Sequence, residues 1–181
     1  MPNQKVILLD RDGVINVNSD KYVKNLDELK IIEGSVKAIS LLTAAGFSIF
    51  VVSNQSAIGR GLINKLDVDT INNHISSLAG KQNGKINGFY YCPHKPNDGC
   101  NCRKPKPGML QQIEHDYSIS LKGSVLVGDA SSDITLARQS SLSPILVRTG
   151  NGRITEEEME TDKNLPICDN LLDAVRNYIL K

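Results

Sequence analysis

The sequence predicts an α/β protein with a doubly wound, mostly parallel β-sheet. Short continuous apolar runs alternate with segments of helical periodicity, and polar residues gather where several of the apolar runs end. No repeat or low-complexity linker interrupts the 181 residues. Since a domain commonly has roughly 100–200 residues, we expect residues 1–181 to form a single domain.

The first elements are expected in the order strand, helix, strand. Residues 5–9 read KVILL, a short apolar run typical of a strand covered on both faces. Ser35 is a candidate cap for the following helix, which is expected to stop at Gly46. Residues 47–52 then predict the second strand, which closes with a run of polar residues.

A helix is expected over residues 65–79, with core candidates Leu66, Ile71, Ile75 and Leu78. Residues 88–91 predict a short strand that leads into a cysteine-containing loop. Pro107 then starts another helix, whose expected inward residues are Met109, Leu110, Ile113 and Tyr117. Strands are expected over 125–127 and 144–147, a helix capped by Ser131 lies between them, and 171–179 closes the chain as a helix.

Polar side chains follow three of these strands. Ligands of such sheets bind beyond the carboxyl ends of the strands, so these side chains are expected to share one crevice. They are Asp10, Asp12, Ser53, Asn54, Asp129 and Asp133.

Several carboxylates in one crevice repel one another unless a cation neutralises them, and Mg²⁺ is the usual oxygen-bound ion. Asp10, Asp129 and a backbone carbonyl near Asp12 could hold it. An aspartate is an established nucleophile toward phosphoryl groups, and a second carboxyl can act as acid and base. Ser53 and Lys104 would hold the transferring oxygens. Each motif alone could be an ordinary turn or a solvated loop cation, but their joint order favours phosphoryl transfer.

The cysteines indicate a second metal. Three of the four lie within eleven residues, beside a histidine. The loop 92–102 thus offers Cys92, His94, Cys100 and Cys102, the ligand set of a closed structural zinc site. The alternatives are a disulfide, which would leave one thiol of the cluster unpaired, and unrelated surface thiols.

Composition excludes other classes. The formal net charge is +1, from 21 basic and 20 acidic residues, so no basic surface is expected to hold nucleic acid. No apolar run approaches the roughly 18–20 residues of a membrane span, and the first residues lack the apolar stretch of a secretory signal. We therefore expect a cytoplasmic protein without nucleic-acid or membrane partners.

These motifs resemble those of the haloacid dehalogenase superfamily of aspartate-nucleophile phosphatases. Residues 10–16, DRDGVIN, are similar to its first motif, Ser53 to the second, Lys104 to the third, and Asp129 with Asp133 to the fourth. The resemblance covers about residues 6–152 and implies a Rossmann-like fold without a large cap. It also implies these roles: Asp10 as nucleophile, Asp12 as general acid/base, Mg²⁺ on Asp10, Asp12 and Asp129 with Asp133 behind them, and structural Zn²⁺ on Cys92, His94, Cys100 and Cys102.

Within the superfamily the chain resembles the small zinc-containing branch. Its members hydrolyse either the 7-phosphate of D-glycero-D-manno-heptose 1,7-bisphosphate or histidinol phosphate. Residues 53–61, 103–110 and 147–150 are similar to the heptose-acting members, whereas the short cysteine loop has the spacing of the histidinol-acting ones. The heptose resemblance implies a phospho-aspartate intermediate and a role in making nucleotide-activated heptose for lipopolysaccharide core.

The same resemblance implies which residues bind a small phosphorylated sugar. These are Asp20, Lys21, Tyr22, Ser53, Asn54, Gln55, Ser56, Arg103 and Lys104. The chain departs from many heptose-acting members at Ala130, where they carry lysine. Two other classes remain as alternatives: a zinc-loop binding module and a switch resembling a response regulator. We expect the protein to be a monomer.

Overall fold

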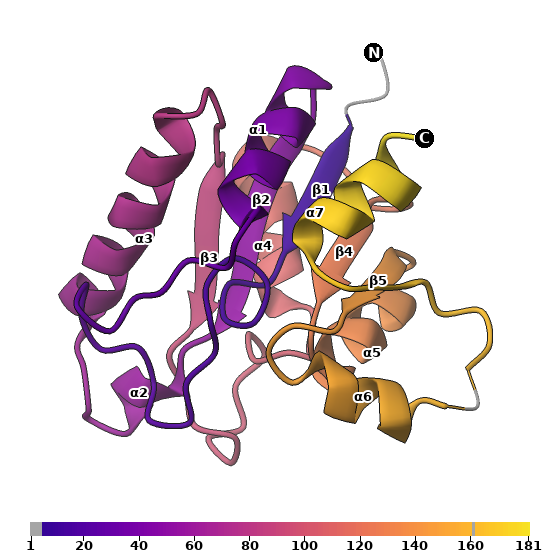
Figure 1. Cartoon of the computed structure of the whole chain (residues 1–181). Coiled ribbons are helices and arrows are strands. Elements are labelled where there is room, and N and C mark those ends of the chain that lie inside the picture. The colour runs from indigo at the N-terminus through magenta and orange to yellow at the C-terminus, as the bar shows by residue number, and fades with distance from the viewer. Residues whose placement is uncertain (1–4, 161) are drawn as a thin grey trace.

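The protein is built on one parallel sheet of six strands, in the order β3-β2-β1-β4-β5-β6 (Figure 1). The computed structural model describes residues 5–160 and 162–181. The strands are β1 Val6–Leu9, β2 Ser48–Asn54, β3 Gly88–Cys92, β4 Val125–Gly128, β5 Ser143–Val147 and β6 Ile167–Cys168. The helices are α1 Ser35–Ala44, α2 Ser56–Gly59, α3 Lys65–Gly80, α4 Gly108–Tyr117, α5 Ser131–Gln139, α6 Gly152–Glu158 and α7 Leu171–Ala174, followed by a π-helical turn, η1, Val175–Ile179.

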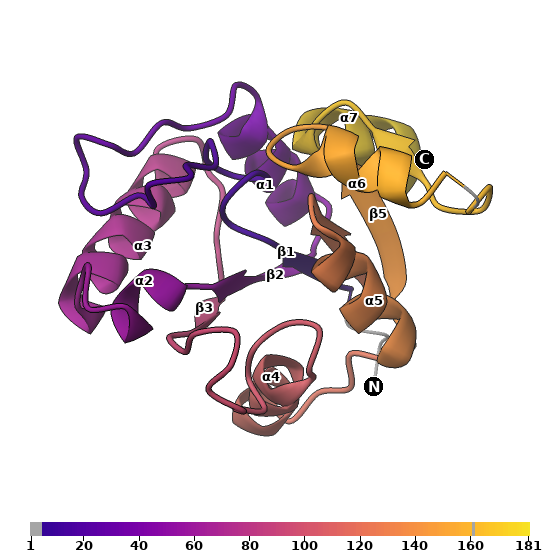
Figure 2. The ribbon, with the colours of Figure 1, turned by 90° about the horizontal axis from the view of Figure 1, so that it is seen from below.

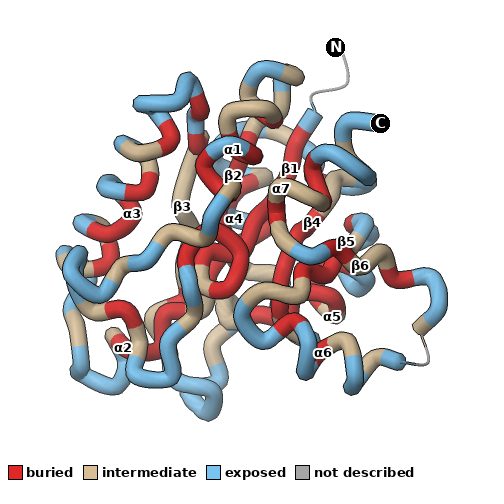
Figure 3. The backbone as a smooth tube through the Cα atoms, in the orientation of Figure 1, coloured by how far each residue is buried: buried red, intermediate tan, exposed pale blue. Residues whose placement is uncertain are grey.

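Helices cover both faces of the sheet, which confirms the doubly wound α/β prediction. Figure 2 shows α1, α3 and α7 on one side and α4 on the other. Alternate residues of β1 divide between the two cores: Ile7 and Leu9 pack with the α1 and α3 side, Val6 and Leu8 with the α4 and α5 side. The central strands β1, β2 and β4 are accordingly mostly buried (Figure 3), as expected for a parallel sheet covered by helices, whereas β3 at the edge of the sheet is mostly of intermediate exposure.

The register of the central strands brings three strand ends together. Leu9 in β1 is aligned with Val51 in β2 and Val127 in β4. The backbone N–H of Asp10 still donates to the Val127 carbonyl, at 2.9 Å. Asp10 therefore leaves the sheet beside the carboxyl ends of both neighbouring strands.

Four local predictions were wrong. Gly34, with φ +83°, is the N-terminal cap of α1, and the Ser35 hydroxyl instead donates to the Ile15 carbonyl. Ser131 does not cap α5, because Asp133 Oδ2 accepts from the backbone N–H of Ala130, where the helix begins. Leu66 lies on the outer face of α3 and is 72% exposed. Tyr117, expected to point inward, is 40% exposed: its ring packs against Phe50, but its hydroxyl donates to the Asn87 carbonyl at the surface.

Three elements were missing from the prediction: α2, α6 and β6. Each is too short, at 4, 7 and 2 residues, to display a hydrophobic period. The added strand β6 extends the sheet beyond β5 in the same parallel direction. No helix in the described part of the chain is long and apolar enough to cross a membrane.

Candidate active site

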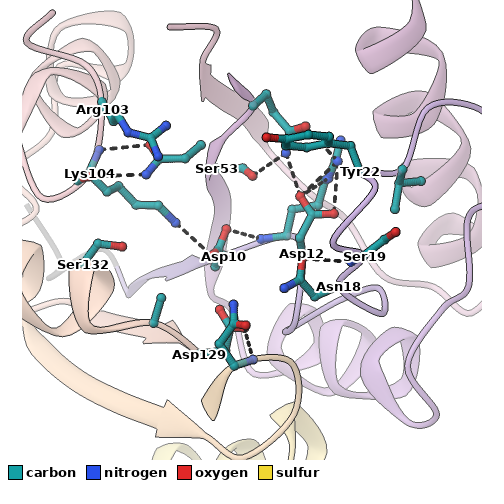
Figure 4. Close-up of a pocket in the computed structure, with 16 residues that line it drawn as sticks. Asp10, Asp12, Asn18, Ser19, Tyr22, Ser53, Arg103, Lys104, Asp129 and Ser132 are labelled. Atoms are coloured by element: carbon teal, nitrogen blue, oxygen red, sulfur yellow. Dashed lines mark hydrogen bonds and ion pairs between the residues drawn. The ribbon is translucent and has the colours of Figure 1, made fainter. Parts of the chain in front are cut away.

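A polar pocket of about 240 Å³ lies at the carboxyl edge of the sheet (Figure 4). It is lined from the ends of β1, β2 and β4 and from the loops that follow the first strand, the cysteine cluster and β5. Asp10 lies between Lys104 and Asp12 in the close-up. The pocket collects Asp10, Asp12, Tyr22, Ser53, Asn54, Gln55, Arg103, Lys104 and Asp129 among the residues expected to form a site.

Lys104 is the central cation of this pocket. Its ammonium nitrogen lies 2.9 Å from Asp10 Oδ2 and 2.6 Å from Asp133 Oδ1, and donates to the Val52 carbonyl at 2.9 Å. All three partners are oxygens, so every donor of the buried ammonium group has an acceptor. The side chain is thereby fixed against the expected nucleophile.

The pKa values reflect this burial. Burial raises the pKa of Asp10 well above its usual range, and the Lys104 charge opposes that rise only in part. For Lys104 burial acts to lower the pKa, but the charges of Asp10 and Asp133 outweigh it and leave the pKa raised. One lysine thus compensates incompletely for the carboxylates around it, and a further cation would be stabilised here.

Asp129, after β4, is held from two directions. Its Oδ2 accepts from the backbone N–H of Asn151 at 2.7 Å, and its carbonyl accepts from the Thr155 hydroxyl at 2.9 Å. Gly13 and Gly150, with φ +88° and +59°, pass so close that a Cβ on either would meet the Asp129 carboxylate. Burial raises the pKa of Asp129 to about 6.

The carboxylates suited to a metal are those of Asp10, Asp129 and Asp133. Each offers an oxygen, these oxygens lie within 4.8 Å of one another, and all three residues are buried. Hard oxygen donors of this kind fit Mg²⁺. The Asp12 carboxylate does not belong to this cluster, which leaves its main-chain carbonyl as the group it could offer.

Asp12 is surrounded by hydrogen-bond donors. Its Oδ1 accepts from Asn16 Nδ2 at 2.8 Å and its Oδ2 from Gln55 Nε2 at 2.7 Å. Arg11 adds Nε and Nη2, at 3.2 and 3.0 Å from Oδ2. Burial acts to raise the pKa of Asp12, but the Arg11 charge and these hydrogen bonds outweigh it, so the pKa is lowered. The arrangement therefore stabilises the carboxylate form.

Ser53 and Asn54 at the end of β2, with Gln55 directly after it, form another part of the pocket lining. Gln55 Nε2 also donates to the Ser53 hydroxyl at 2.7 Å, linking that residue to Asp12. Asn54 clamps the backbone of Lys104: its Oδ1 accepts from the Lys104 N–H at 3.0 Å and its Nδ2 donates to the carbonyl at 3.3 Å. Ser56 is buried at the start of α2 and does not line the pocket.

The expected sugar-binding residues separate into two groups. Tyr22 and Arg103 line the pocket, from opposite sides in Figure 4. Asp20 and Lys21 are exposed and lie outside the lining. Arg103 Nη1 donates to the His94 carbonyl at 3.4 Å, which ties it to the cysteine loop. Lining residues that the sequence analysis did not single out include Asn18, Ser19, Val23, Ser132 and Asn151.

The loop 92–102 brings its three thiols and one imidazole together. Cys92 Sγ lies 3.2 Å from Cys102 Sγ and 3.6 Å from Cys100 Sγ, and His94 Nδ1 lies 3.2 Å from Cys102 Sγ. The four ligand atoms fall within 4.8 Å of one another. Three sulfur atoms and one ring nitrogen at this spacing fit a tetrahedral zinc ion.

Two residues beside the site were not singled out from the sequence: Arg11, which contacts Asp12, and Asn72, which contacts Arg11. Arg11 is 1% exposed, although its neighbours in the sequence are both aspartates. Asn72 comes from α3 and accepts from Arg11 Nη1 at 3.2 Å. No local pattern connects residues 61 positions apart, whereas a buried arginine between two acidic residues could have been suspected from the DRD run itself.

Comparison with known proteins agrees with this geometry. Residues 101–174 match the HAD-hydrolase-like family model. The chain is 42% identical over 175 residues to the D-glycero-beta-D-manno-heptose-1,7-bisphosphate 7-phosphatase of Pseudomonas putida, covering 97% of this chain and 99% of that one. It is 39% identical to the enzyme of the same name from Bordetella bronchiseptica, covering 98% of each chain.

A solved structure shows the same fold. The crystal structure of D,D-heptose 1,7-bisphosphate phosphatase from Bordetella bronchiseptica, complexed with magnesium and phosphate, superposes with a TM-score of 0.91 at 37% identity. The match covers 97% of this chain and 98% of that one. With the relatives above, it shows that the chain is a phosphoric monoester hydrolase of the haloacid dehalogenase-like phosphatases and belongs to the family of the heptose-1,7-bisphosphate 7-phosphatases.

Proposed function

We propose that this enzyme removes the 7-phosphate of D-glycero-D-manno-heptose 1,7-bisphosphate through a phospho-aspartate on Asp10. The observation that carries the reaction class is the meeting of Asp10 with Lys104, Asp129 and Asp133 in one polar pocket. Similarity to heptose bisphosphatases over nearly the whole chain supports the substrate. The product would serve the synthesis of nucleotide-activated heptose for lipopolysaccharide core.

In the first step Asp10 attacks the phosphorus atom. The bond from phosphorus to the sugar oxygen breaks, and that oxygen takes a proton from the Asp12 carboxyl, whose protonated form the negative charge of the bound phosphate would favour over the carboxylate of the free site. Lys104 lies 2.9 Å from Asp10 and would stabilise the negative charge on the transferring oxygens. Ser53, at the end of β2, is placed to donate to the same oxygens.

In the second step the Asp12 carboxylate takes a proton from water. The water oxygen attacks the phosphorus of the phospho-aspartate, inorganic phosphate leaves, and the Asp10 carboxylate is restored. The donors from Arg11, Asn16 and Gln55 stabilise Asp12 in the ionised form that this step needs.

Asp10, Asp129 and Asp133 would hold Mg²⁺, with the main-chain carbonyl of Asp12 as a further oxygen. The ion would neutralise charge so that an anionic phosphate can approach an anionic nucleophile. The fit is supported by the raised pKa values of Asp10 and Asp129, because burial makes charged carboxylates costly there without more cations.

Cys92, His94, Cys100 and Cys102 would hold a structural Zn²⁺. Four protein ligands leave no open position for water, so the ion would order the loop rather than take part in the reaction. Arg103 and Lys104 follow Cys102 directly, so an ordered loop places both cations. Free thiols also fit the reducing cytoplasm, where we propose that the enzyme acts as a monomer.

A substrate panel tests the proposal. Phosphate release is measured with Mg²⁺ and with EDTA from each anomer of the heptose bisphosphate, from histidinol phosphate and from fructose 1,6-bisphosphate. We expect Mg²⁺-dependent release with a strong preference for a heptose bisphosphate. A preference for histidinol phosphate would contradict the substrate, and no release from any ester would contradict the reaction.

A further inference from the structure

We propose that Asn72, on α3, is a positioning residue for the acid/base carboxylate Asp12 and acts through the buried guanidinium of Arg11. The inference rests on the proposed phosphatase function, because it assigns a part in that reaction to a residue outside the four motifs. Asn72 lies 61 positions from Arg11 in the sequence, and the two meet through the hydrogen bond from Arg11 Nη1 to Asn72 Oδ1.

The guanidinium of Arg11 divides its donors between three residues. Nε and Nη2 face the Asp12 carboxylate, at 3.2 and 3.0 Å from Oδ2. Nη2 also donates to Gln55 Oε1 at 3.0 Å, and Nη1 donates to Asn72 Oδ1 at 3.2 Å. Because the guanidinium is planar and rigid, contacts at Gln55 and Asn72 fix the plane in which it meets Asp12.

Burial makes the contact with Asn72 consequential. Arg11 is 1% exposed and Asn72 is 5% exposed. If the Asn72 amide oxygen were removed, water could therefore not readily replace it as the acceptor for Arg11 Nη1. Among the buried residues of α3 Asn72 is the polar one, beside Val68, Ile71, Ile75 and Ala79. Asparagine is also a weak helix former, so neither helix propensity nor core packing accounts for it at this position.

The position of Asp12 matters because it must reach the leaving oxygen. General acids work only within hydrogen-bond distance of the atom they protonate. Asp12 follows Asp10 by two residues and its side chain is only 22% exposed, so its rotamer depends on the neighbours that hold it. A guanidinium free to tilt would let the carboxyl turn away from the bridging oxygen.

Leaving-group chemistry separates this role from a general loss of structure. Loss of an alkoxide such as a sugar oxygen needs a proton, whereas p-nitrophenolate leaves readily without one. The value of kcat/KM covers the steps up to formation of the phospho-aspartate and release of the alcohol. A misplaced acid therefore lowers kcat/KM for the sugar ester more than for p-nitrophenyl phosphate.

The experiment compares Asn72→Ala with Asn73→Ala, an exposed neighbour on the same helix. We expect Asn72→Ala to lower kcat/KM for the heptose bisphosphate by about tenfold, mainly through kcat, and for p-nitrophenyl phosphate by less than about twofold. Asn73→Ala should change neither value. Asn72→Asp keeps an oxygen acceptor in the same place and should restore the ratio of the two substrates.

Several outcomes would overturn the inference. They are an equal loss on both esters, an unchanged or increased preference for the sugar ester in Asn72→Ala, or no rescue by Asn72→Asp. Should Asn72→Ala fail to fold, Asn72→Ser provides a shorter polar side chain that cannot reach Arg11 in the same way.

Failure of the proposed substrate is recognised separately. A wild-type enzyme that cleaves p-nitrophenyl phosphate but not the heptose bisphosphate contradicts that substrate alone, and glycerol phosphate then serves as the alkyl ester. A wild-type enzyme that cleaves no ester contradicts both proposals.

Discussion

Lys104 Nζ lies 2.9 Å from Asp10 Oδ2. A residue just after the cysteine loop thus forms an ion pair with the carboxylate that follows the central strand β1. The same nitrogen lies 2.6 Å from Asp133 Oδ1 in α5. Asn54 fixes the backbone of Lys104 through both its amide nitrogen and its amide oxygen. A single buried cation therefore connects the loop, the end of β2 and the start of α5.

Replacing that cation should destabilise the fold as well as stop turnover. Lys104→Met leaves Asp10 and Asp133 as buried carboxylates without their partner, at a cost of about 3–5 kcal/mol in the free energy of unfolding. Urea unfolding measures this loss. Because the proposed Mg²⁺ would bind the folded state, adding it should recover stability in the variant.

The matched control is Lys106→Met, two residues further along. Lys106 is exposed, and its Nζ donates to the Cys100 carbonyl at 2.8 Å. Its replacement should change the free energy of unfolding by no more than about 0.5 kcal/mol. Equal effects of the two substitutions would argue against the special role of Lys104.

Asp133 and Asp12 should differ in their effect on magnesium. The carboxylate of Asp133 lies in the buried cluster with Asp10 and Asp129, whereas the side chain of Asp12 does not. Asp133→Asn should therefore raise the Mg²⁺ concentration for half-maximal activity by about 10–100-fold. Asp12→Asn should lower kcat and leave that concentration nearly unchanged. The reverse pattern in magnesium titrations would place the metal on the Asp12 side chain.

Asp10→Asn should abolish phosphate release. The amide is a poor nucleophile, so no phospho-enzyme should be trapped after acid quenching with labelled substrate. The sheet should remain intact, since the backbone N–H of residue 10 still reaches the Val127 carbonyl, and circular dichroism would check this. Asp27→Asn, an exposed carboxylate in the same loop, is the control. Retained turnover in Asp10→Asn would exclude Asp10 as nucleophile.

The fold was largely predictable because parallel strands buried on both faces leave a plain signal. The runs that became β1 and β4 are apolar without alternation and end at the carboxylates of the pocket. The residue that caps the N-terminus of α1 was less predictable. Gly34 takes that position with a positive φ, and the Ser35 hydroxyl donates to the Ile15 carbonyl, 20 positions away, instead of capping the helix.

The site was predictable where it depends on strand ends and not where it depends on side-chain direction. The sequence predicts a backbone carbonyl near Asp12 as a metal ligand, and only the family resemblance implies metal binding by Asp12 itself; its carboxylate lies outside the cluster of Asp10, Asp129 and Asp133. In the structure Asn16, Gln55 and Arg11 take up both of its oxygens. Those contacts depend on tertiary packing, and the contact from Asn72 to Arg11 crosses between two elements that no motif relates.

Removal of zinc should lower activity without touching the carboxylates. Arg103 directly follows the loop 92–102, and its Nη1 donates to the carbonyl of His94 inside the loop, so loss of the ion would loosen this contact. We expect kcat/KM for the bisphosphate to fall by about 10–100-fold after zinc chelation with Mg²⁺ restored, and to recover when zinc is added back.

Two cysteine substitutions distinguish the effect of losing a proposed zinc ligand from the effect of losing any cysteine thiol. Cys100→Ser removes one ligand of the cluster and should reproduce the loss in zinc content and activity. Cys168→Ser alters a cysteine outside the cluster and should leave the zinc content unchanged. Because the proposed ion only orders the loop, the zinc-free enzyme should still form the phospho-aspartate, but slowly. Unchanged kinetics in a folded sample shown to be free of zinc would mean that the loop holds Arg103 and Lys104 without the metal.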